Sequence, residues 1–315
     1  MNDGFTYREQ LPDRAAGRVL LDWLVERWRH GDRAHWSERL ARGEVTLEGV
    51  PATGGEPLTA GRSLAWQRPP WEEPAAPLGC ALLFRDDHFL AIAKPAGLPT
   101  MPSGGRYLHH TLLHQVRRRF PEATPLHRLD RGTSGLVLFA RTAAARTAGS
   151  ALFHDGAIER HYRGRVVGPP IAAPFTIDLP IGERPHPTLG RVFCAVAPGS
   201  AGTPGRAART DVAPLDHDAA TGRSRVAIRI GSGRPHQIRI HLAAAGWPLE
   251  GEPFFGPGGT PLEGTRARPG DVGYQLHAIA LVADHPLGGA PLHLWCAPPP
   301  ALRLRDEVPS APRPA

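Results

Sequence analysis

The chain has 315 residues, of which 41% are hydrophobic and 21% charged, and 37 lysines and arginines against 30 aspartates and glutamates give a formal net charge of +7. This composition is typical of a soluble protein of two domains, which is large enough to fold without a disulfide or a metal. No run of about eighteen apolar residues occurs and the N-terminus has no basic stretch before an apolar one, so we expect neither a membrane span nor a secretory signal.

The cysteines and the basic residues indicate the cellular location of the protein and the charge of its partner. Cys80, Cys194 and Cys296 lie far apart and form neither a disulfide framework nor a zinc ribbon, which favours a reducing, cytoplasmic location. Lys94 is the only lysine, and a GC-rich coding sequence accounts for most of this arginine excess. The net positive charge still favours an anionic partner, of which nucleic acid is the commonest.

The N-terminal part is predicted to be a small helical unit with a hairpin. Apolar residues at helical spacing predict a helix over 13–30, and a second helix over 36–42 ends at Gly43. Alternating residues over 45–49 and 64–66 predict two short strands. The proline-rich stretch 68–77 is typical of a stiff linker, so we place the first domain at 1–67.

The second domain, 78–298, alternates strands and helices. Strands outnumber helices and some are paired as hairpins, so we predict an α+β fold. Glycine-rich and proline-rich loops are expected over 199–205 and 252–270, and a disordered tail over 299–315. The expected strands are 82–84, 89–93, 136–140, 158–166 and 226–230, and the expected helices are 111–120, a helix capped by Thr142, and 236–245.

The densest polar cluster is the segment 127–135, HRLDRGTSG, which precedes the apolar strand 136–140. It places Asp130 between two arginines on a loop that also carries two glycines and two hydroxyls. Taken alone, an aspartate flanked by arginines is more often a surface ion pair, which contributes about 0–1 kcal/mol. The remainder of the chain changes this interpretation.

The segment resembles the H-R-L-D-x-x-T-S-G signature of the RluA-type pseudouridine synthases, in which the aspartate is catalytic, and all the fixed positions are present. The resemblance extends over about 80–298, because other blocks fall in the family's order. They are 82–100 with its K-P-A-G stretch, 158–162 with Arg160 in place of lysine, 233–242 (GRPHQIRIHL), and 276–278 with 285–286. The resemblance implies a pseudouridine synthase fold with a mixed, mostly antiparallel sheet, flanking helices and a central RNA-binding cleft, in a monomer without a cofactor.

The chemistry explains why these residues would be needed. Isomerising uridine breaks the bond from C1′ to N1 and rejoins the base through C5, so the site needs an ionised nucleophile or base beside the sugar. Asp130 is implied in that role, with Arg239 as its charge partner and Tyr162 stacked on the target base and assisting proton transfer at C5. Without the resemblance, Arg239 is an ordinary solvated charge on a helix, and Tyr162 is a half-buried strand aromatic.

A stacked uridine has to be flipped out at a cost of a few kcal/mol, of which stacking on an aromatic ring recovers about 1–3 kcal/mol. The resemblance implies that Arg128 helps fill the vacated space and that Leu242 lines the uracil pocket. The alternatives are a phosphate contact or ion pair for Arg128 and a plain core position for Leu242. We also expect RNA contacts from His127, Arg131 and Thr133, whereas Lys94 and Gly97 are expected to shape the loop beneath the site.

Some positions depart from the family pattern. Pro235 stands where threonine or serine is usual, and Glu252 and Phe255 fall in GEPFFG in place of G-D-x-x-Y-G. We expect these changes to bear on substrate preference. The 16 histidines form no recognisable metal motif and no phosphate-binding loop is present, so we expect neither a metal nor ATP.

The N-terminal unit resembles a degenerate S4-type RNA-binding domain, which implies that Arg39 and Arg42 on its second helix contact RNA. A small helical cap packed on the catalytic domain is the alternative. For the whole chain we predict an RNA pseudouridine synthase acting on structured RNA. Ribosomal and transfer RNA enzymes of the family share these motifs, so both substrates fit. The rival predictions are a catalytically silent RNA-binding or ribosome-assembly factor and a carboxylate-based hydrolase of nucleosides.

Overall fold

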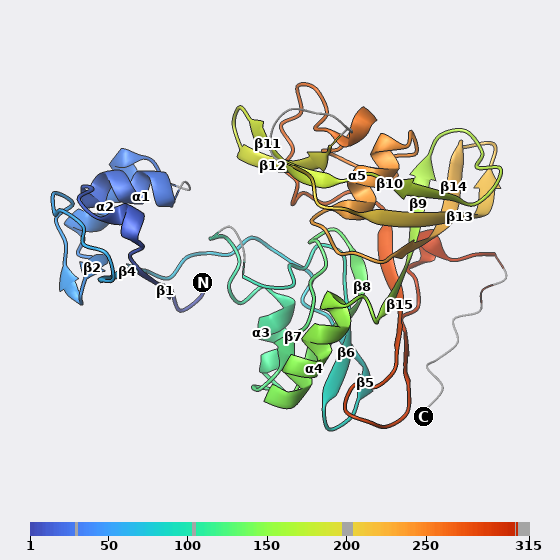
Figure 1. Cartoon of the computed structure of the whole chain (residues 1–315), viewed down its shortest axis with the longest axis horizontal. Helices are drawn as coiled ribbons and strands as arrows, with labels where there is room; N and C mark the ends of the chain where they lie inside the picture. Colours follow the sequence, from blue (N-terminus) through green and yellow to red (C-terminus); the bar gives the residue numbers. More distant parts are fainter. Residues whose placement is uncertain (29–30, 103–104, 197–203, 306, 308–315) are drawn as a thin grey trace. The chain divides into compact units, whose positions relative to one another are not determined.

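The computed structural model describes residues 1–28, 31–102, 105–196, 204–305 and 307, and the chain divides into two compact units (Figure 1). The smaller unit comprises Met1–Ala75 with Pro102–His109, and the larger comprises Ala76–Met101 with His110–Ala315. Within the described residues, every helix is too short or too polar to cross a bilayer.

The smaller unit packs two helices and a short 3-10 turn with a four-stranded sheet around buried tryptophans, among them Trp23, Trp36 and Trp66. The helix predicted over 13–30 is shorter, because the chain turns at Gly17 with a φ of 77° between the 3-10 turn and the first helix, and His30 lies outside the described residues. The elements are β1 (Phe5–Gln10), η1 (Asp13–Ala15), α1 (Leu20–Arg27), α2 (Arg33–Ala41), β2 (Val45–Leu47), β3 (Val50–Pro51) and β4 (Ser63–Arg68), with sheet order β1-β4-β2-β3.

The segment 102–109 joins the smaller unit through backbone hydrogen bonds that the sequence did not signal. The buried carboxylate of Glu73 accepts the backbone N–H groups of Leu108 at 2.7 Å and His109 at 2.9 Å. The guanidinium of Arg68 donates to the carbonyl of Gly105. The chain therefore returns to the first unit after leaving it.

The larger unit is built on a ten-stranded sheet in which each pairing is antiparallel except that of β8 with β15, which confirms the predicted α+β class. The main order is β10-β13-β14-β9-β15-β8-β6-β5, with β16 beside β15 and β7 beside β8. The strands are β5 (Ala81–Arg85), β6 (Phe89–Lys94), β7 (Thr124–Pro125), β8 (Ser134–Ala140), β9 (Glu159–Val167), β10 (Phe175–Asp178), β13 (Arg209–Asp218), β14 (Arg223–Ile230), β15 (Leu276–Ala283) and β16 (Leu292–Trp295), and a separate hairpin pairs β11 (Ile181–His186) with β12 (Gly190–Ala195).

Helices cover this sheet at two places (Figure 1). One helix packs on β8, and its N-terminus is capped as predicted, since the Thr142 hydroxyl accepts the N–H of Ala145 at 3.1 Å. Another helix contacts β12 and β13. The helical elements are α3 (Leu112–Arg117), α4 (Ala143–His154), α5 (Gln237–Ala244), η2 (Pro257–Gly259) and η3 (Pro300–Leu302), of which α4 is the helix on β8 and α5 the helix on β12 and β13.

Gly135 explains how β8 meets β15. Its φ is 115°, and a Cβ at this position would lie 2.1 Å from the carbonyl oxygen of Ala278. Only glycine permits so close an approach of the two backbones. As a result, the loop that precedes β8 lies beside the start of β15, next to β9.

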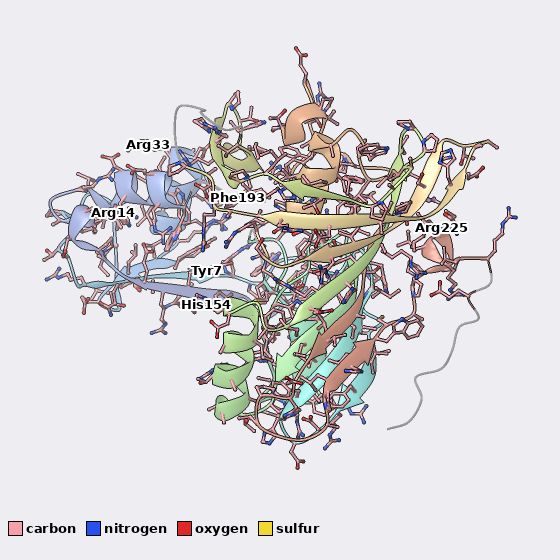
Figure 2. The ribbon with its side chains drawn as sticks, turned by 45° about the vertical axis from the view of Figure 1, so that its right-hand side comes forward. Tyr7, Arg14, Arg33, His154, Phe193 and Arg225 are labelled. Carbon is pink, nitrogen blue, oxygen red and sulfur yellow. The ribbon has the colours of Figure 1, made fainter. Side chains whose placement is uncertain are left out.

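The prediction of a disordered tail over 299–315 is wrong for its first part. Residues Pro300–Leu302 form a 3-10 turn, and the Leu302 side chain is only 1% exposed. The Arg163 guanidinium donates to the Leu302 carbonyl at 3.2 Å, and Arg225 donates to the carbonyl of Arg303 (Figure 2). Arginines on β9 and β14 therefore hold this segment, while 306 and 308–315 lie outside the described residues.

Candidate active site

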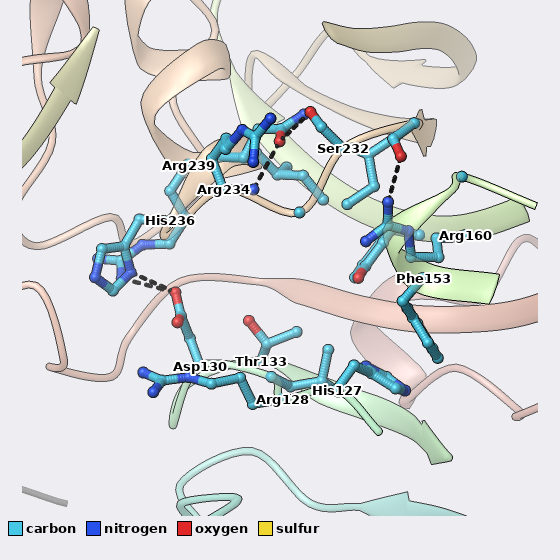
Figure 3. Close-up of a pocket in the computed structure, with 18 of the residues that line it drawn as sticks. His127, Arg128, Asp130, Thr133, Phe153, Arg160, Ser232, Arg234, His236 and Arg239 are labelled. Carbon is cyan, nitrogen blue, oxygen red and sulfur yellow. Dashed lines mark hydrogen bonds and ion pairs between the residues drawn. The ribbon is translucent and has the colours of Figure 1, made fainter. Parts of the chain in front are cut away.

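A cavity of about 570 Å³ opens in the larger unit beside Asp130 (Figure 3). Its walls come from the loop before β8, from β9, and from the stretch between β14 and α5. The lining residues are His127, Arg128, Leu129, Asp130, Thr133, Phe153, His154, Asp155, Gly156, Arg160, Tyr162, Arg206, Ile230, Gly231, Ser232, Gly233, Arg234, His236, Gln237, Ile238, Arg239 and Leu276. The cavity thus joins three sequence blocks that are far apart in the chain.

Asp130 is mostly buried, with 19% of its side chain exposed, and its partners are positively charged or polar. Its Oδ2 lies 2.6 Å from Nδ1 of His236 and 3.5 Å from a terminal nitrogen of Arg239. Burial raises the pKa of this carboxyl, but His236, Arg239 and Arg128 together lower the pKa to about 2. Asp130 is therefore a carboxylate over the whole physiological range.

His236 was not predicted as a site residue from the sequence, where the histidines were weighed only as a group of possible metal ligands. It occupies the N-cap position of α5, and its backbone is left-handed with φ 57° and ψ 19°. Its position inside the block 233–242 is the only signal that could have drawn attention to it. The structure brings it closer to Asp130 than Arg239 is.

Arg239 interacts more closely with Glu252 than with Asp130. Its guanidinium forms a two-pronged pair with Glu252, at 2.8 Å and 2.7 Å, and the side chains are only 1% and 2% exposed. The Arg239 guanidinium also lies 4.2 Å from the ring centroid of Tyr274 and 5.0 Å from that of Phe255. Burial opposes the charge of Arg239, yet Glu252 raises its pKa further above the ordinary arginine value.

Glu252 is itself held in place by backbone hydrogen bonds. Its Oε1 also accepts the backbone N–H groups of Phe254 at 3.0 Å and Phe255 at 3.1 Å. The departures at 252 and 255 therefore build the wall that holds Arg239. The expectation that they bear on substrate preference stays a prediction.

Tyr162 lies on β9 and lines the same cavity as Asp130. Its side chain is buried, and this burial, with a further contribution from the negative charge of Asp130, raises the pKa of the phenol to about 12. The hydroxyl is therefore protonated at neutral pH. The cavity places a neutral aromatic group and an ionised carboxylate on shared walls.

Four arginines besides Arg239 line the cavity: Arg128, Arg160, Arg206 and Arg234. None of these four forms an ion pair with a carboxylate of the described residues; Arg234 donates to the Ala207 carbonyl at 3.1 Å, and Arg160 to that of Gly231. The Arg160 side chain is buried, and its Nε has no hydrogen-bond partner. These four arginines therefore bring positive charge to the cavity without forming an ion pair within the described protein.

The family profile for RNA pseudouridylate synthase matches residues 88–244. A protein of Synechocystis sp. named as an uncharacterized RNA pseudouridine synthase is 37% identical over 292 residues, which cover 92% of this chain and 97% of that protein. The chain belongs to the RNA pseudouridine synthase family. It is accordingly an RNA-modifying isomerase.

Other pseudouridine synthases support this assignment. RNA pseudouridine synthase 5 of Arabidopsis thaliana is 29% identical, over 98% of this chain and 96% of that protein. The dual-specificity RNA pseudouridine synthase RluA of Escherichia coli is 31% identical, over 66% of this chain and 88% of that protein. The solved structure of human RNA pseudouridylate synthase domain containing 1 shares the fold, with a TM-score of 0.57 and 24% identity, over 74% of this chain and 89% of that one.

His127 and Thr133, which were predicted to contact RNA, also form contacts within the protein. His127 accepts the N–H of Leu138 at 3.0 Å and stacks on Phe153, and burial lowers the pKa of its imidazole to about 3. The hydroxyl of Thr133 lies 3.2 Å from that of Tyr274. Both His127 and Thr133 line the cavity, and both also stabilise the loop that carries Asp130.

Arg131 and Leu242 do not line the cavity. The Arg131 guanidinium donates to the carbonyl of Gly270 at 3.0 Å and pairs with Asp271, which ties the loop that carries Asp130 to the loop before β15. Leu242 is fully buried in the core, which agrees with the alternative that it is a plain core residue. The apolar part of the cavity wall comes instead from Leu129, Ile230, Ile238 and Leu276.

Lys94 shapes the loop beneath the site, as predicted. Its ammonium is buried and donates to the carbonyls of Leu98 at 2.7 Å, Pro95 at 3.0 Å and Arg131 at 3.3 Å. Burial lowers its pKa to about 7, although the negative charge of Asp130 acts in the opposite direction. In the part of the chain that the structure describes, no group of three or more histidine, cysteine or acidic side chains is arranged to bind a metal ion.

Proposed function

We propose that this enzyme converts a specific uridine of ribosomal or transfer RNA to pseudouridine through Asp130. The proposal rests on one observation above all: the carboxylate of Asp130 is held ionised in the wall of a cavity that also contains Tyr162 and an unpaired group of arginines. Asp130 would meet the ribose, Tyr162 the base, and Arg239 would keep the carboxylate charged and oriented.

The reaction is balanced by the substrate alone. The bond from C1′ to N1 breaks, a bond from C1′ to C5 forms, the proton on C5 leaves, and N1 carries a proton in the product. The product is an isomer of uridine, so no atoms or electrons are supplied from outside. A carboxylate beside C1′ is suited to act as nucleophile or base in this exchange.

Tyr162 would contribute in two separable ways. Stacking of the flipped base on its ring recovers about 1–3 kcal/mol of the cost of extrusion. Its hydroxyl keeps its proton at neutral pH and could exchange it only with a group that appears during the reaction. Arg128, which is exposed and lines the cavity, would occupy the space that the base leaves.

The cavity arginines supply the attraction for the RNA backbone. A guanidinium without a carboxylate partner is free to form two-pronged hydrogen bonds with a phosphate. Arg160, Arg206 and Arg234 line the same cavity. Burial lowers the pKa values of Arg160 and Arg234, and charge repulsion lowers them further, from Arg234 on Arg160 and from Arg206 on Arg234. A bound phosphate would relieve this repulsion.

For the smaller unit we propose the S4-like RNA-binding role, with the domain at about 1–67. Arg42 at the end of α2 is well exposed, as an RNA contact requires. Both arginines pair with a glutamate, Arg42 with Glu38 and Arg39 with Glu44, but 57% of the Arg42 side chain is exposed against 21% of that of Arg39. Arg42 is therefore the better candidate of the two.

The test maps pseudouridines by carbodiimide labelling and primer extension across ribosomal and transfer RNA. Cells carrying only Asp130→Asn are compared with the source cells and with cells carrying Asp87→Asn, a matched change at an exposed aspartate in the hairpin of β5 and β6. We expect one or a few positions to vanish with Asp130→Asn and none with Asp87→Asn. An unchanged map with Asp130→Asn rejects the proposed role.

Purified protein then distinguishes the silent-factor alternative. The wild-type chain is mixed in excess with the RNA that carries the mapped uridine, or with pooled RNA if no position is lost. Product formation in a single turnover supports the enzyme. Tight binding without product would favour an RNA-binding factor on the same fold.

A further inference from the structure

The two oxygens of Asp130 are not equivalent in the structure. Oδ2 lies within hydrogen-bond distance of His236 at 2.6 Å and of Arg239 at 3.5 Å. Among the described residues, no hydrogen bond to Oδ1 is formed, although the residue lines the cavity. One oxygen is thus bound by the protein and the other is open to a substrate.

His236 is held in an unusual backbone conformation to make this contact. It is one of two non-glycine residues with a positive φ in the described chain, the other being Glu48 in a turn of the smaller unit. The left-handed region costs a residue with a Cβ about 1–2 kcal/mol. The side chain of His236 forms no capping hydrogen bond to α5 and points to Asp130 instead, while its backbone carbonyl accepts the N–H of Ile240 at 3.0 Å.

His236 is also the nearer of the two groups that hold Oδ2. Glu252 pairs with two nitrogens of the Arg239 guanidinium. The distance from Arg239 to Oδ2 of Asp130 is 3.5 Å, which is 0.9 Å longer than the 2.6 Å from His236 to the same oxygen. The ring of His236 is in turn backed by Phe255, with centroids 5.7 Å apart. The imidazole therefore has a fixed place beside the carboxylate (Figure 3).

We propose that His236 is a positioning residue that fixes Oδ2 of Asp130, so that Oδ1 is the oxygen presented to the ribose of the target uridine. This inference rests on the proposed function, in which Asp130 acts on the nucleotide. It requires Nδ1 of His236 to carry a proton and donate it to Oδ2. The backbone strain at this residue is retained because it aims the donor at the carboxylate.

Two substitutions separate the donor from the backbone. His236→Asn keeps a side-chain N–H close to the position of Nδ1, and asparagine tolerates the left-handed region. His236→Gly relieves the backbone strain but removes the donor and the contact of the ring with Phe255. Thermal unfolding of both full-length variants checks that each is folded at the assay temperature, so that a loss of rate is not attributed to misfolding.

The measurement is single-turnover conversion of the mapped RNA, together with the dissociation constant of that RNA. We expect His236→Gly to slow conversion about 10- to 100-fold, the loss of one hydrogen bond to a charged group, with RNA affinity unchanged. His236→Asn should restore most of the rate.

A pH series adds a readout that a structural role would not move. The pKa of Asp130 is about 2, and His236 is one of the groups that lower it. Removing His236 should move the acid limb of the rate to higher pH, because one of the groups that lower the pKa of Asp130 is lost, and His236→Asn should move it less. The other charged or titratable groups that act on Asp130 are unchanged in both variants; they are Arg239, Arg128, Lys94, Tyr162 and Tyr274.

The outcomes are decisive in both directions. A wild-type rate and acid limb in His236→Gly overturn the proposal, and so does an asparagine variant as slow as the glycine variant. Weaker RNA binding at an unchanged rate also overturns it, because His236 would then contact RNA. Asp130→Asn in the same assay keeps the two hypotheses apart, since only its full activity would reject the catalytic role of Asp130 itself.

Discussion

The arginines of the two units lie in different electrostatic surroundings. At the C-terminal end of α2 in the smaller unit, Arg42 pairs with Glu38 at 2.5 Å and Arg39 with Glu44 at 3.1 Å. In the larger unit, Arg206 and Arg234 line the cavity without an ion pair to any described carboxylate. The net charge of the chain is therefore a poor guide to where RNA binds, because only unpaired arginines keep their full attraction for phosphate.

A second contrast concerns arginine–glutamate pairs of the same chemistry. The pair of Arg239 and Glu252 is buried, whereas that of Arg42 and Glu38 is more than half exposed. Breaking a buried pair leaves an uncompensated charge inside the protein, while water replaces a lost partner at the surface. Burial of the pair, and not its chemical identity, therefore decides how much stability is lost when one partner is removed.

The largest effect is expected from Glu252→Ala. The change strands the Arg239 guanidinium and two backbone N–H groups, so we expect the larger unit to lose about 3–5 kcal/mol of stability. Glu38→Ala is the matched control, with an expected cost below about 1 kcal/mol. Urea unfolding of the full chain followed by circular dichroism measures both, and equal effects would contradict the contrast.

A smaller effect is expected from the cavity arginines. Arg206→Ala and Arg234→Ala should each weaken RNA binding severalfold and reduce the slope of log affinity against log salt by about 1, since each would remove one phosphate contact. Fluorescence anisotropy over a salt series gives both quantities. Arg42→Ala is the comparison, and an equally large change there would assign the smaller unit an equal share of the RNA backbone.

The smallest effect is expected from pH. Asp130 has a pKa of about 2 and is ionised above it, while Tyr162 has a pKa of about 12 and is protonated below it. Neither group changes state between pH 5 and about 8, so the single-turnover rate should vary little over this range. A limb centred near pH 7 would instead implicate another group, and Lys94, whose pKa burial lowers to about 7, is one candidate.

The loop that carries Asp130 was identified from its resemblance to a contiguous family motif, H-R-L-D-x-x-T-S-G. Asp130 sits between a turn and a strand, Gly135 supplies the positive φ, and Thr133 and Ser134 provide hydroxyls within a few residues. Strands 136–140, 158–166 and 226–230 were also predictable, since alternating or continuous apolar residues fix which face is buried. The α+β class followed from their number and spacing.

The partners of Asp130 could be predicted only in part. Arg239 was identified through the family resemblance, but its closer engagement with Glu252 was not, because the two are 13 residues apart and meet only where α5 packs beside the following loop. His236 was missed because nothing in its local sequence requires a left-handed backbone. The packing of 102–109 and of 300–305 likewise depends on distant groups, Glu73 for the first and Arg163 and Arg225 for the second.

Sequence alone therefore determined the class of the protein and the loop that carries the carboxylate, because short-range periodicity, turn chemistry and a contiguous motif encode them. Tertiary structure decided which oxygen of Asp130 is held, which arginines remain unpaired and which side chains form the cavity wall. These properties depend on distances between groups more than 100 residues apart, as His236 and Asp130 are. Burial then sets their energies, because a charge or a hydrogen bond gains its strength from the exclusion of water.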